Sequence, residues 1–233
     1  MSSSYRAGYI ALIGPPNAGK STFLNTVLGE KVAIVSPKPQ TTRTSITGIH
    51  STAEEQIVFL DTPGVHAARG KLNRFLVDAA WGALQEAHGV ILFLDGSRYA
   101  GNEKALERDL RPLQKRLGSL DAPMAVALNK VDQIKPKERL LGLLSDCAAR
   151  WPEVELVPIS ARTGVGVDTL LSVIRNFLPI GPALFPEDQL STASVRFMAS
   201  EIVREKLFLA LNQELPYNIA VEIETWEECR SRT

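Results

Sequence analysis

The chain has 233 residues, 26 basic and 26 acidic side chains, and 45% hydrophobic residues. This composition is typical of a soluble globular protein and excludes a disordered, collagen-like or coiled-coil chain. Its longest apolar runs are far shorter than the ~20 residues that a membrane-spanning helix needs. Its two cysteines cannot form a disulfide framework. The N-terminus does not have the pattern of a signal peptide, so we expect a cytoplasmic protein.

The neutral net charge is the sum of two unlike parts. Residues 1–180 hold 21 basic and 17 acidic side chains, whereas residues 181–233 hold 5 and 9. A protein that binds nucleic acid through overall basicity would carry a clear positive charge. We therefore expect no DNA partner.

Apolar β-branched runs alternate with amphipathic stretches from residue 9 to about residue 178. This alternation predicts an α/β fold in which helices flank a mostly parallel six-stranded sheet. The predicted strands are Tyr9–Ile13, Ser45–His50, Gln56–Leu60, Val90–Asp95, Met124–Asn129 and Val154–Ile159. The predicted helices are Lys20–Leu28, Lys71–Ala87, Asn102–Arg116, Pro136–Arg150 and Val167–Phe177.

The pattern changes after residue 180, where prolines and a glycine interrupt both periodicities. We interpret residues 181–191 as a linker. Beyond it, the spacing of apolar residues predicts a helix over Thr192–Glu214, and alternation predicts a strand over Asn218–Trp226.

Residues 14–21 read G-P-P-N-A-G-K-S, which fits the phosphate-binding pattern G-x-x-x-x-G-K-[ST] between a strand and a helix. Small residues allow backbone N–H groups to turn around a polyphosphate, and the helix N-terminus adds a favourable dipole. Lys20 would reach the β- and γ-phosphates, and Ser21 would bind Mg²⁺. The alternative, a chance glycine-rich turn, does not explain the flanking strand and helix.

Residues 61–64 read D-T-P-G and follow a predicted strand. Ligands bind at the carboxyl ends of strands in open α/β sheets. Asp61 can therefore hold Mg²⁺, directly or through a water, and the Gly64 N–H can meet a γ-phosphate. The alternative, a plain proline–glycine turn, would not explain an aspartate directly after a buried strand.

Residues 129–132 read N-K-V-D, which predicts specificity for guanine. Asp132 can accept two hydrogen bonds from guanine, whereas adenine would leave the carboxylate unpaired. Lys130 can lay its alkyl stem over the base, and Asn129 can brace the neighbouring loops. Ser160 and Ala161 follow the last predicted strand, and their backbone N–H groups would face the guanine O6.

These motifs, in this order, resemble those of the translation-factor-related GTPases. Q-T-T-R at residues 40–43 resembles the effector region of the Era and MnmE-like group. The segments at residues 201–206 and 214–224 resemble the region that joins the GTPase domain of the Era family to a KH RNA-binding domain. The resemblance covers nearly the whole chain. It implies a P-loop, Ras-like G domain over residues 1–180, a linker over 181–191 and the N-terminal part of a KH-like domain over 192–233.

The same resemblance implies a GTPase that binds small-subunit ribosomal RNA, acts in assembly of the 30S subunit and rRNA maturation, and associates peripherally with the inner membrane. It places Thr41 and Thr42 in a switch loop where a threonine binds Mg²⁺ and the γ-phosphate, and we favour Thr42. Asn17 matches a position that helps to bind K⁺ in some relatives, although an ordinary polar loop residue fits as well.

The predicted site follows from the motifs and the resemblance together. The predicted catalytic residues are Lys20, Thr42 and Gly64, and the predicted Mg²⁺ ligands are Ser21, Thr42 and Asp61. The residues predicted to bind GTP or GDP are Gly14, Asn17, Ala18, Gly19, Lys20, Ser21, Thr22, Asp61, Thr62, Pro63, Gly64, Val65, Asn129, Lys130, Asp132, Ser160 and Ala161.

Two features depart from the related patterns. Ras-type GTPases orient the attacking water with a glutamine directly after D-x-x-G, where this chain has Val65. We therefore expect slow intrinsic hydrolysis that a partner or K⁺ accelerates; the alternative is a GTP-binding assembly factor with negligible hydrolysis.

KH domains clamp RNA with a G-x-x-G loop, and none follows Glu222. We therefore expect a chain truncated within the KH domain; the alternative is that RNA binding is lost or lies elsewhere in the protein. We disfavour an RNA-binding module in which nucleotide is secondary.

Overall fold

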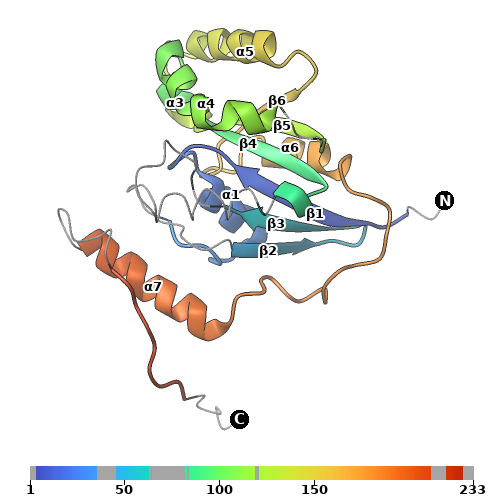
Figure 1. The fold of residues 1–233 in the computed structure, drawn as a ribbon, viewed down its shortest axis with the longest axis vertical. Coiled ribbons are helices and arrows are strands. Elements are labelled where there is room, and N and C mark those ends of the chain that lie inside the picture. Colours follow the sequence, from blue (N-terminus) through green and yellow to red (C-terminus); the bar gives the residue numbers. More distant parts are fainter. Residues whose placement is uncertain are drawn as a thin grey trace.

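The computed structural model describes residues 4–35, 46–62, 64, 82, 84–118, 121–210 and 219–227. Helices cover both faces of a central sheet, and a long helix lies beyond one edge of it (Figure 1). The strands are β1 (Arg6–Ile13), β2 (Ile46–Ser51), β3 (Glu55–Asp61), β4 (Gly89–Asp95), β5 (Met124–Asn129) and β6 (Glu155–Pro158). The helices are α1 (Lys20–Leu28), α3 (Gly96–Tyr99), α4 (Glu103–Leu117), the 3₁₀ turn η1 (Val131–Gln133), α5 (Glu138–Arg150), α6 (Val167–Arg175) and α7 (Val195–Ala210).

The six strands form one sheet in the order β2-β3-β1-β4-β5-β6. Only β2 runs antiparallel to its neighbour; the other pairs are parallel. The register places Asp61 beside Leu12 and Asp95 beside Asn129. Because parallel strands end at the same edge, the loops after β1, β3, β4 and β5 meet there, which positions the functional site. The predicted fold class is confirmed.

Each face of the sheet has its own apolar core. On one face, α1 and α6 contribute Phe23 and Leu170, and Phe23 packs against the rings of Phe59 and Phe93. On the other face, α3, α4 and α5 cover the sheet. Central strands buried on both faces explain why they are continuous apolar runs rather than alternating ones.

The predicted strands and helices that fall on described residues agree with the structure, except near the C-terminus. The predicted helix Lys71–Ala87 lies largely outside the described residues, and α7 lies within the predicted helix Thr192–Glu214. The predicted strand Asn218–Trp226 is wrong over its described residues, 219–226, which form no strand. A strand needs a partner for its backbone groups, and no strand in the described part of the chain pairs with this segment. Instead, Arg196 on α7 donates to the Ile223 carbonyl.

The predicted linker runs along the sheet and is hydrogen-bonded to it. The Gly181 N–H donates to the Tyr5 carbonyl, at 3.0 Å. Further along, the Ile49 N–H donates to the Leu190 carbonyl at 2.9 Å, and the Ser191 hydroxyl donates to the Thr47 carbonyl at 2.7 Å. The segment therefore covers part of the otherwise exposed edge of β2. The limits of the predicted domains, 1–180, 181–191 and 192–233, stay a prediction.

Gln56 on β3 is the polar anchor of this segment. Its side chain is fully buried, and its amide oxygen accepts hydrogen bonds from the backbone of Leu184 and Phe185, at 2.7 and 2.9 Å. Its amide nitrogen donates to the Phe185 carbonyl and to the Ser51 hydroxyl, at 2.9 and 3.0 Å. A buried amide with all of these partners fixes one position of the segment on the sheet.

We expect Gln56→Leu to lower the free energy of unfolding by about 2 kcal/mol, because the near-isosteric side chain leaves several polar partners unpaired. Urea unfolding followed by circular dichroism measures the change. Gln189→Leu is the matched control, since Gln189 is only half-buried and donates a single hydrogen bond, to the Ser191 carbonyl. Equal losses in the two variants would contradict the anchoring role of Gln56.

Candidate functional site

The loop between β1 and α1 passes close beneath the loop after β5. A Cβ added at Gly19 would lie 2.1 Å from the side-chain amide of Asn129, and Gly19 has a φ of 96°. Glycine is therefore required there for both the backbone conformation and the close approach. Directly after it, α1 begins at Lys20, so that backbone N–H groups of its first turn are available to an anion.

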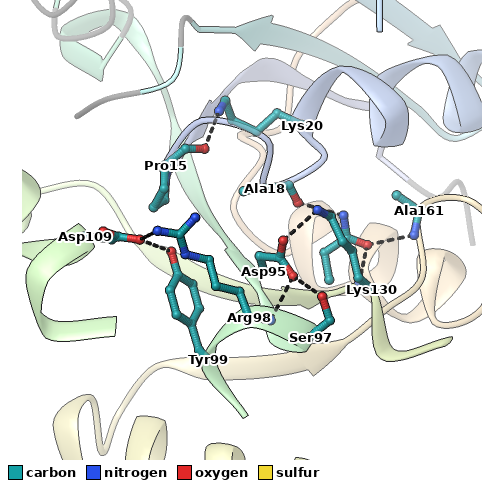
Figure 2. Close-up of polar contacts among 11 residues, drawn as sticks. Pro15, Ala18, Lys20, Asp95, Ser97, Arg98, Tyr99, Asp109, Lys130 and Ala161 are labelled. Carbon is teal, nitrogen blue, oxygen red and sulfur yellow. Dashed lines mark hydrogen bonds and ion pairs between the residues drawn. The ribbon is translucent and has the colours of Figure 1, made fainter. Parts of the chain in front are cut away.

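Lys20 is a buried amine at the floor of this loop. Its Nζ lies 3.3 Å from the carbonyl oxygens of Gly14 and Pro15, and Figure 2 shows the contact with Pro15. Burial lowers the pKa of Lys20 to about 8, although the charge of Asp61 opposes the shift. A cation held this way has lost most of its hydration, so an anionic group that reached it would be bound strongly.

Asp61, at the end of β3, is buried beside Lys20 and Ser21. The Ser21 hydroxyl donates to Asp61 Oδ2 at 2.6 Å. Burial raises the pKa of Asp61 to about 6, against the opposing effects of Lys20 and the Ser21 hydrogen bond. Its other oxygen, Oδ1, is buried and has no hydrogen-bond partner among the described residues. A hydroxyl and a carboxylate with a buried, unpaired oxygen fit the oxygen ligands that Mg²⁺ prefers.

The backbone at Gly64 lies directly against the phosphate-binding loop. A Cβ at this position would come within 2.6 Å of the Pro16 Cα and 2.8 Å of its nitrogen. The Thr62 side chain does not take part in the site, because its buried hydroxyl donates to the Leu12 carbonyl at 2.7 Å. The predicted residues Thr42, Pro63 and Val65 lie outside the described residues.

Asn129 joins three segments of the site. Its Nδ2 donates to the Ala18 carbonyl at 2.8 Å, and its Oδ1 accepts from the backbone N–H groups of Lys130 and Ala161 at 2.8 and 2.9 Å. The side chain is almost completely buried. It therefore holds the phosphate-binding loop, the end of β5 and the loop after β6 in one arrangement, as the sequence pattern predicts.

Asp132 lies in η1, just after β5. Ser160 Oγ donates to its Oδ1 at 2.7 Å, and Arg162 donates to its Oδ2 at 2.6 Å. Burial alone would raise the pKa of Asp132, but these hydrogen bonds and the charge of Arg162 outweigh it and hold the pKa below its ordinary value. The carboxylate therefore stays ionised and keeps further lone pairs available as acceptors.

Asp95 is a site residue that the motifs do not contain. It lies at the end of β4, and its Oδ2 accepts from Lys130 Nζ at 2.6 Å (Figure 2). Its Oδ1 accepts from the Ser97 hydroxyl and the Arg98 backbone N–H at the start of α3. An aspartate directly after a buried strand is the same signal that identified Asp61, and it could have identified Asp95.

These residues surround a cavity of about 710 Å³. The predicted residues that line it are Asn17, Gly19, Lys20, Ser21, Thr22, Gly64, Asn129, Lys130, Asp132 and Ala161. Gly14, Ala18, Asp61, Thr62 and Ser160 belong to its supporting walls rather than its surface. The lining residues that the motifs missed are Pro16, Ile34, Val35, Asp95, Arg98, Gln133 and Arg162.

Comparison with known proteins agrees with this geometry. Residues 9–130 match a family described as 50S ribosome-binding GTPase. GTPase Era of Nitratidesulfovibrio vulgaris (strain DSM 19637 / Miyazaki F) is 49% identical over 230 residues, which are 99% of this chain and 75% of that protein. GTPase Era of Geotalea uraniireducens is 41% identical over 96% of this chain and 73% of its own length. The chain belongs to the Era family of GTPases.

Two solved structures of Era proteins share the fold of this Era-family chain. One is a variant of Aquifex aeolicus Era bound to GDP and AlF4⁻, with a TM-score of 0.83 and 39% identity. The other is Era in complex with MgGDPNP and nucleotides 1506–1542 of 16S ribosomal RNA, with a TM-score of 0.85 and 38% identity. Each alignment covers 91% of this chain and 70% of the solved chain. Among the described helices, none combines the length and apolar character needed to cross a bilayer.

We expect Asn129→Ala to lower the free energy of unfolding of the ligand-free protein by about 3 kcal/mol, because a buried carbonyl and two N–H groups lose their shared partner. Urea unfolding measures the change. Asn102→Ala is the control, since Asn102 caps only the N-terminus of α4 through the Ala105 N–H and should cost about 1 kcal/mol. A cost at Asn129 no greater than at Asn102 would show that Asn129 does not join the loops.

Proposed function

We propose that this chain is a GTP-binding and GTP-hydrolysing switch protein that acts in assembly of the small ribosomal subunit. The observation that carries the proposal is a pair of opposite charges that line one cavity. Buried Lys20 marks what we call its phosphate end, and the acceptor carboxylate of Asp132 marks its base end. A nucleotide with an anionic phosphate chain and a base that donates hydrogen bonds is complementary to both ends.

The phosphate end is suited to a polyphosphate. A phosphate oxygen that replaced the Gly14 and Pro15 carbonyls as the partner of Lys20 would be a full anion rather than a dipole. Such a charge-assisted hydrogen bond is stronger, and the buried surroundings of Lys20 strengthen it further. The first-turn N–H groups of α1 would bind the same phosphates, and the neighbouring anion would raise the pKa of Lys20.

Ser21 and Asp61 are the described residues that would hold Mg²⁺. Bound there, the ion would neutralise negative charge on the β- and γ-phosphates. The unpaired, buried Oδ1 of Asp61 and the Ser21 hydroxyl support this assignment. A magnesium nucleotide is present in the related complex of Era with MgGDPNP and ribosomal RNA, which also supports it.

Guanine fits the base end better than adenine. With Ser160 and Arg162 each bonded to one oxygen of Asp132, a second lone pair on each oxygen can accept from the N1–H and the amino group of guanine. Adenine has no such pair of donors, so its complex would leave the carboxylate under-bonded. Lys130, held through its amine by Asp95, would keep its alkyl stem against the base.

Hydrolysis would take place beside Gly64, whose N–H would meet the γ-phosphate. The close packing of Gly64 on Pro16 supports this role, because it brings the loop after β3 to the phosphate end. Metal binding by Thr42 and nucleotide contacts by Pro63 and Val65 stay predictions. The side chain of valine cannot orient a water. We therefore propose that a ribosomal partner or a K⁺ ion near Asn17 supplies the missing group and makes turnover fast.

We propose small-subunit ribosomal RNA and the 30S subunit as the partners. The complex of a related Era with a 16S ribosomal RNA fragment supports this proposal. Function in the cytoplasm and peripheral association with the inner membrane belong to the same proposal.

The guanine assignment predicts the effect of Asp132→Asn. The amide accepts through only one atom and places a donor opposite the guanine donors, so GTP affinity should fall about 100-fold. Affinity for xanthosine triphosphate, which has a carbonyl in place of the amino group, should rise. Competition against a fluorescent guanine nucleotide measures both.

Asp146→Asn is the matched control, because Asp146 is an exposed aspartate on α5 and does not line the cavity. It should leave both affinities unchanged. Unaltered GTP affinity in Asp132→Asn would overturn the assignment of the base end.

Single-turnover hydrolysis of GTP tests the enzymatic part of the proposal. We expect a slow rate for the chain alone and an increase of about tenfold or more when small ribosomal subunits or K⁺ are added, because electrostatic stabilisation completed from outside accelerates related GTPases strongly. Lys20→Ala should abolish the stimulated rate. A rate that is already fast in Na⁺ without subunits, and that neither addition changes, would contradict the dependence on a partner or K⁺.

A further inference from the structure

One wall of the nucleotide cavity is the short segment of residues 31–35, which follows α1. Ile34 and Val35 line the cavity. The segment has no regular secondary structure, so other groups must hold it. Asn25 on α1 does so at its middle, where Oδ1 accepts from the Val32 and Ala33 N–H groups at 3.1 and 2.9 Å. Asn25 holds neither of the two residues that face the cavity.

The end of this wall is held by a residue 170 positions away in sequence. Glu205 on α7 accepts a hydrogen bond from the Val35 N–H through Oε1, at 3.0 Å. Its other oxygen, Oε2, forms an ion pair with Lys31. The Glu205 side chain is 4% exposed, whereas that of Lys31 is 47% exposed. Both oxygens of one buried carboxylate thus bind the two ends of the five-residue wall.

Helix α7 is itself anchored to the sheet, so Glu205 is not a loose surface contact. Met198 on α7 packs against the apolar core that contains α1 and α6. Phe208, one turn after Glu205, is fully buried. The chain immediately before α7 pairs with β2 through Ser191 and Gly48, and in Figure 1 the helix lies on that side of the sheet. The carboxylate therefore has a fixed position relative to the cavity.

We propose that Glu205 is a positioning residue for nucleotide binding: it holds Val35 so that the wall of the cavity closes against the bound nucleotide. This inference rests on the proposed function, because it takes the cavity to be the guanine-nucleotide site. Glu205 acts through Val35 and does not touch the nucleotide. This role of Glu205 places on α7 a contact that helps to retain the nucleotide, outside the part of the chain that carries the GTPase motifs.

The physical basis is the cost of leaving this carboxylate or the Val35 N–H unpaired. Leaving a buried carboxylate without its hydrogen-bond donors is costly, so α7 and the wall favour one common arrangement. Without the carboxylate, the Val35 N–H loses its partner and the wall can separate from the nucleotide. Release should become faster, while association, which requires an open wall in any case, should change less.

The test is the rate at which the 233-residue chain releases a fluorescent GDP analogue after addition of excess GDP and Mg²⁺. Glu205→Ala should speed release about tenfold, the effect of losing a hydrogen bond to a charged group. Lys31→Met changes a half-exposed side chain, so the fold should be preserved, and it keeps the Val35 hydrogen bond. This variant should speed release about two- to threefold. In the double variant the two effects should be less than additive, because both act through one carboxylate.

Glu201→Gln is the matched control on the same helix. Glu201 binds Arg204 within α7 and has no described contact with residues 31–35, so this variant can lower the melting temperature but should leave GDP release within about twofold of the parent chain. If Glu205→Ala releases GDP at the parent rate, the inference is wrong. If Glu201→Gln speeds release equally, α7 acts only by packing, and the inference is again wrong.

Failure of the Glu205 inference can be distinguished from failure of the proposed function. If the parent chain does not bind the GDP analogue, or binds it regardless of Asp132→Asn, the assignment of the cavity is at fault. If the parent chain binds and Asp132→Asn weakens binding, the release rates of the Glu205 and Lys31 variants decide the role of Glu205 alone.

Discussion

A buried primary amine needs oxygen atoms as hydrogen-bond partners. Among the described residues, the amine of Lys20 has two carbonyls at 3.3 Å and the nearby charge of Asp61. Both charged groups are destabilised by burial, which lowers the pKa of Lys20 and raises that of Asp61. A polyphosphate with a divalent cation would give each group an opposite charge. The ligand-free protein therefore holds unfavourable desolvation energy that binding relieves.

Such a site requires rigid surroundings, because mobile loops would let water reach the amine and the carboxylate. The parallel sheet supplies that rigidity by ending four neighbouring strands at one edge. Asn129 then joins the loop after β1, the end of β5 and the loop after β6 through three hydrogen bonds. Gly19 allows the contact, since any Cβ there would collide with the Asn129 amide. The loop glycine and the asparagine are thus one structural unit, although they are far apart in sequence.

The sequence predicts the parts of the protein in which neighbouring residues share one role. Buried parallel strands appear as apolar runs, and a loop that binds phosphate requires glycine, lysine and serine at fixed spacing, so both could be predicted. Gln56 and Glu205 could not, because each is an ordinary polar residue, and the partners that give it its role lie more than a hundred positions away. The strand predicted over Asn218–Trp226 is the opposite kind of error, because the local pattern is present but residues 219–226 form no strand. Alternation describes the side chains of a strand, but a strand also needs a partner for its backbone, which no local pattern specifies.

The acidic character of the C-terminal part has a different meaning once its contacts are known. Two of its carboxylates, on Glu201 and Glu205, bind Arg204 and Lys31 rather than solvent, so they contribute little to the field that an RNA partner would meet. Glu205 also joins α7 to the wall of the nucleotide cavity. Any such coupling is reciprocal: if the position of α7 changes nucleotide affinity, nucleotide binding must stabilise the docked position of α7 by the same free energy. A ligand that favours an undocked α7 would then weaken nucleotide binding without approaching the cavity.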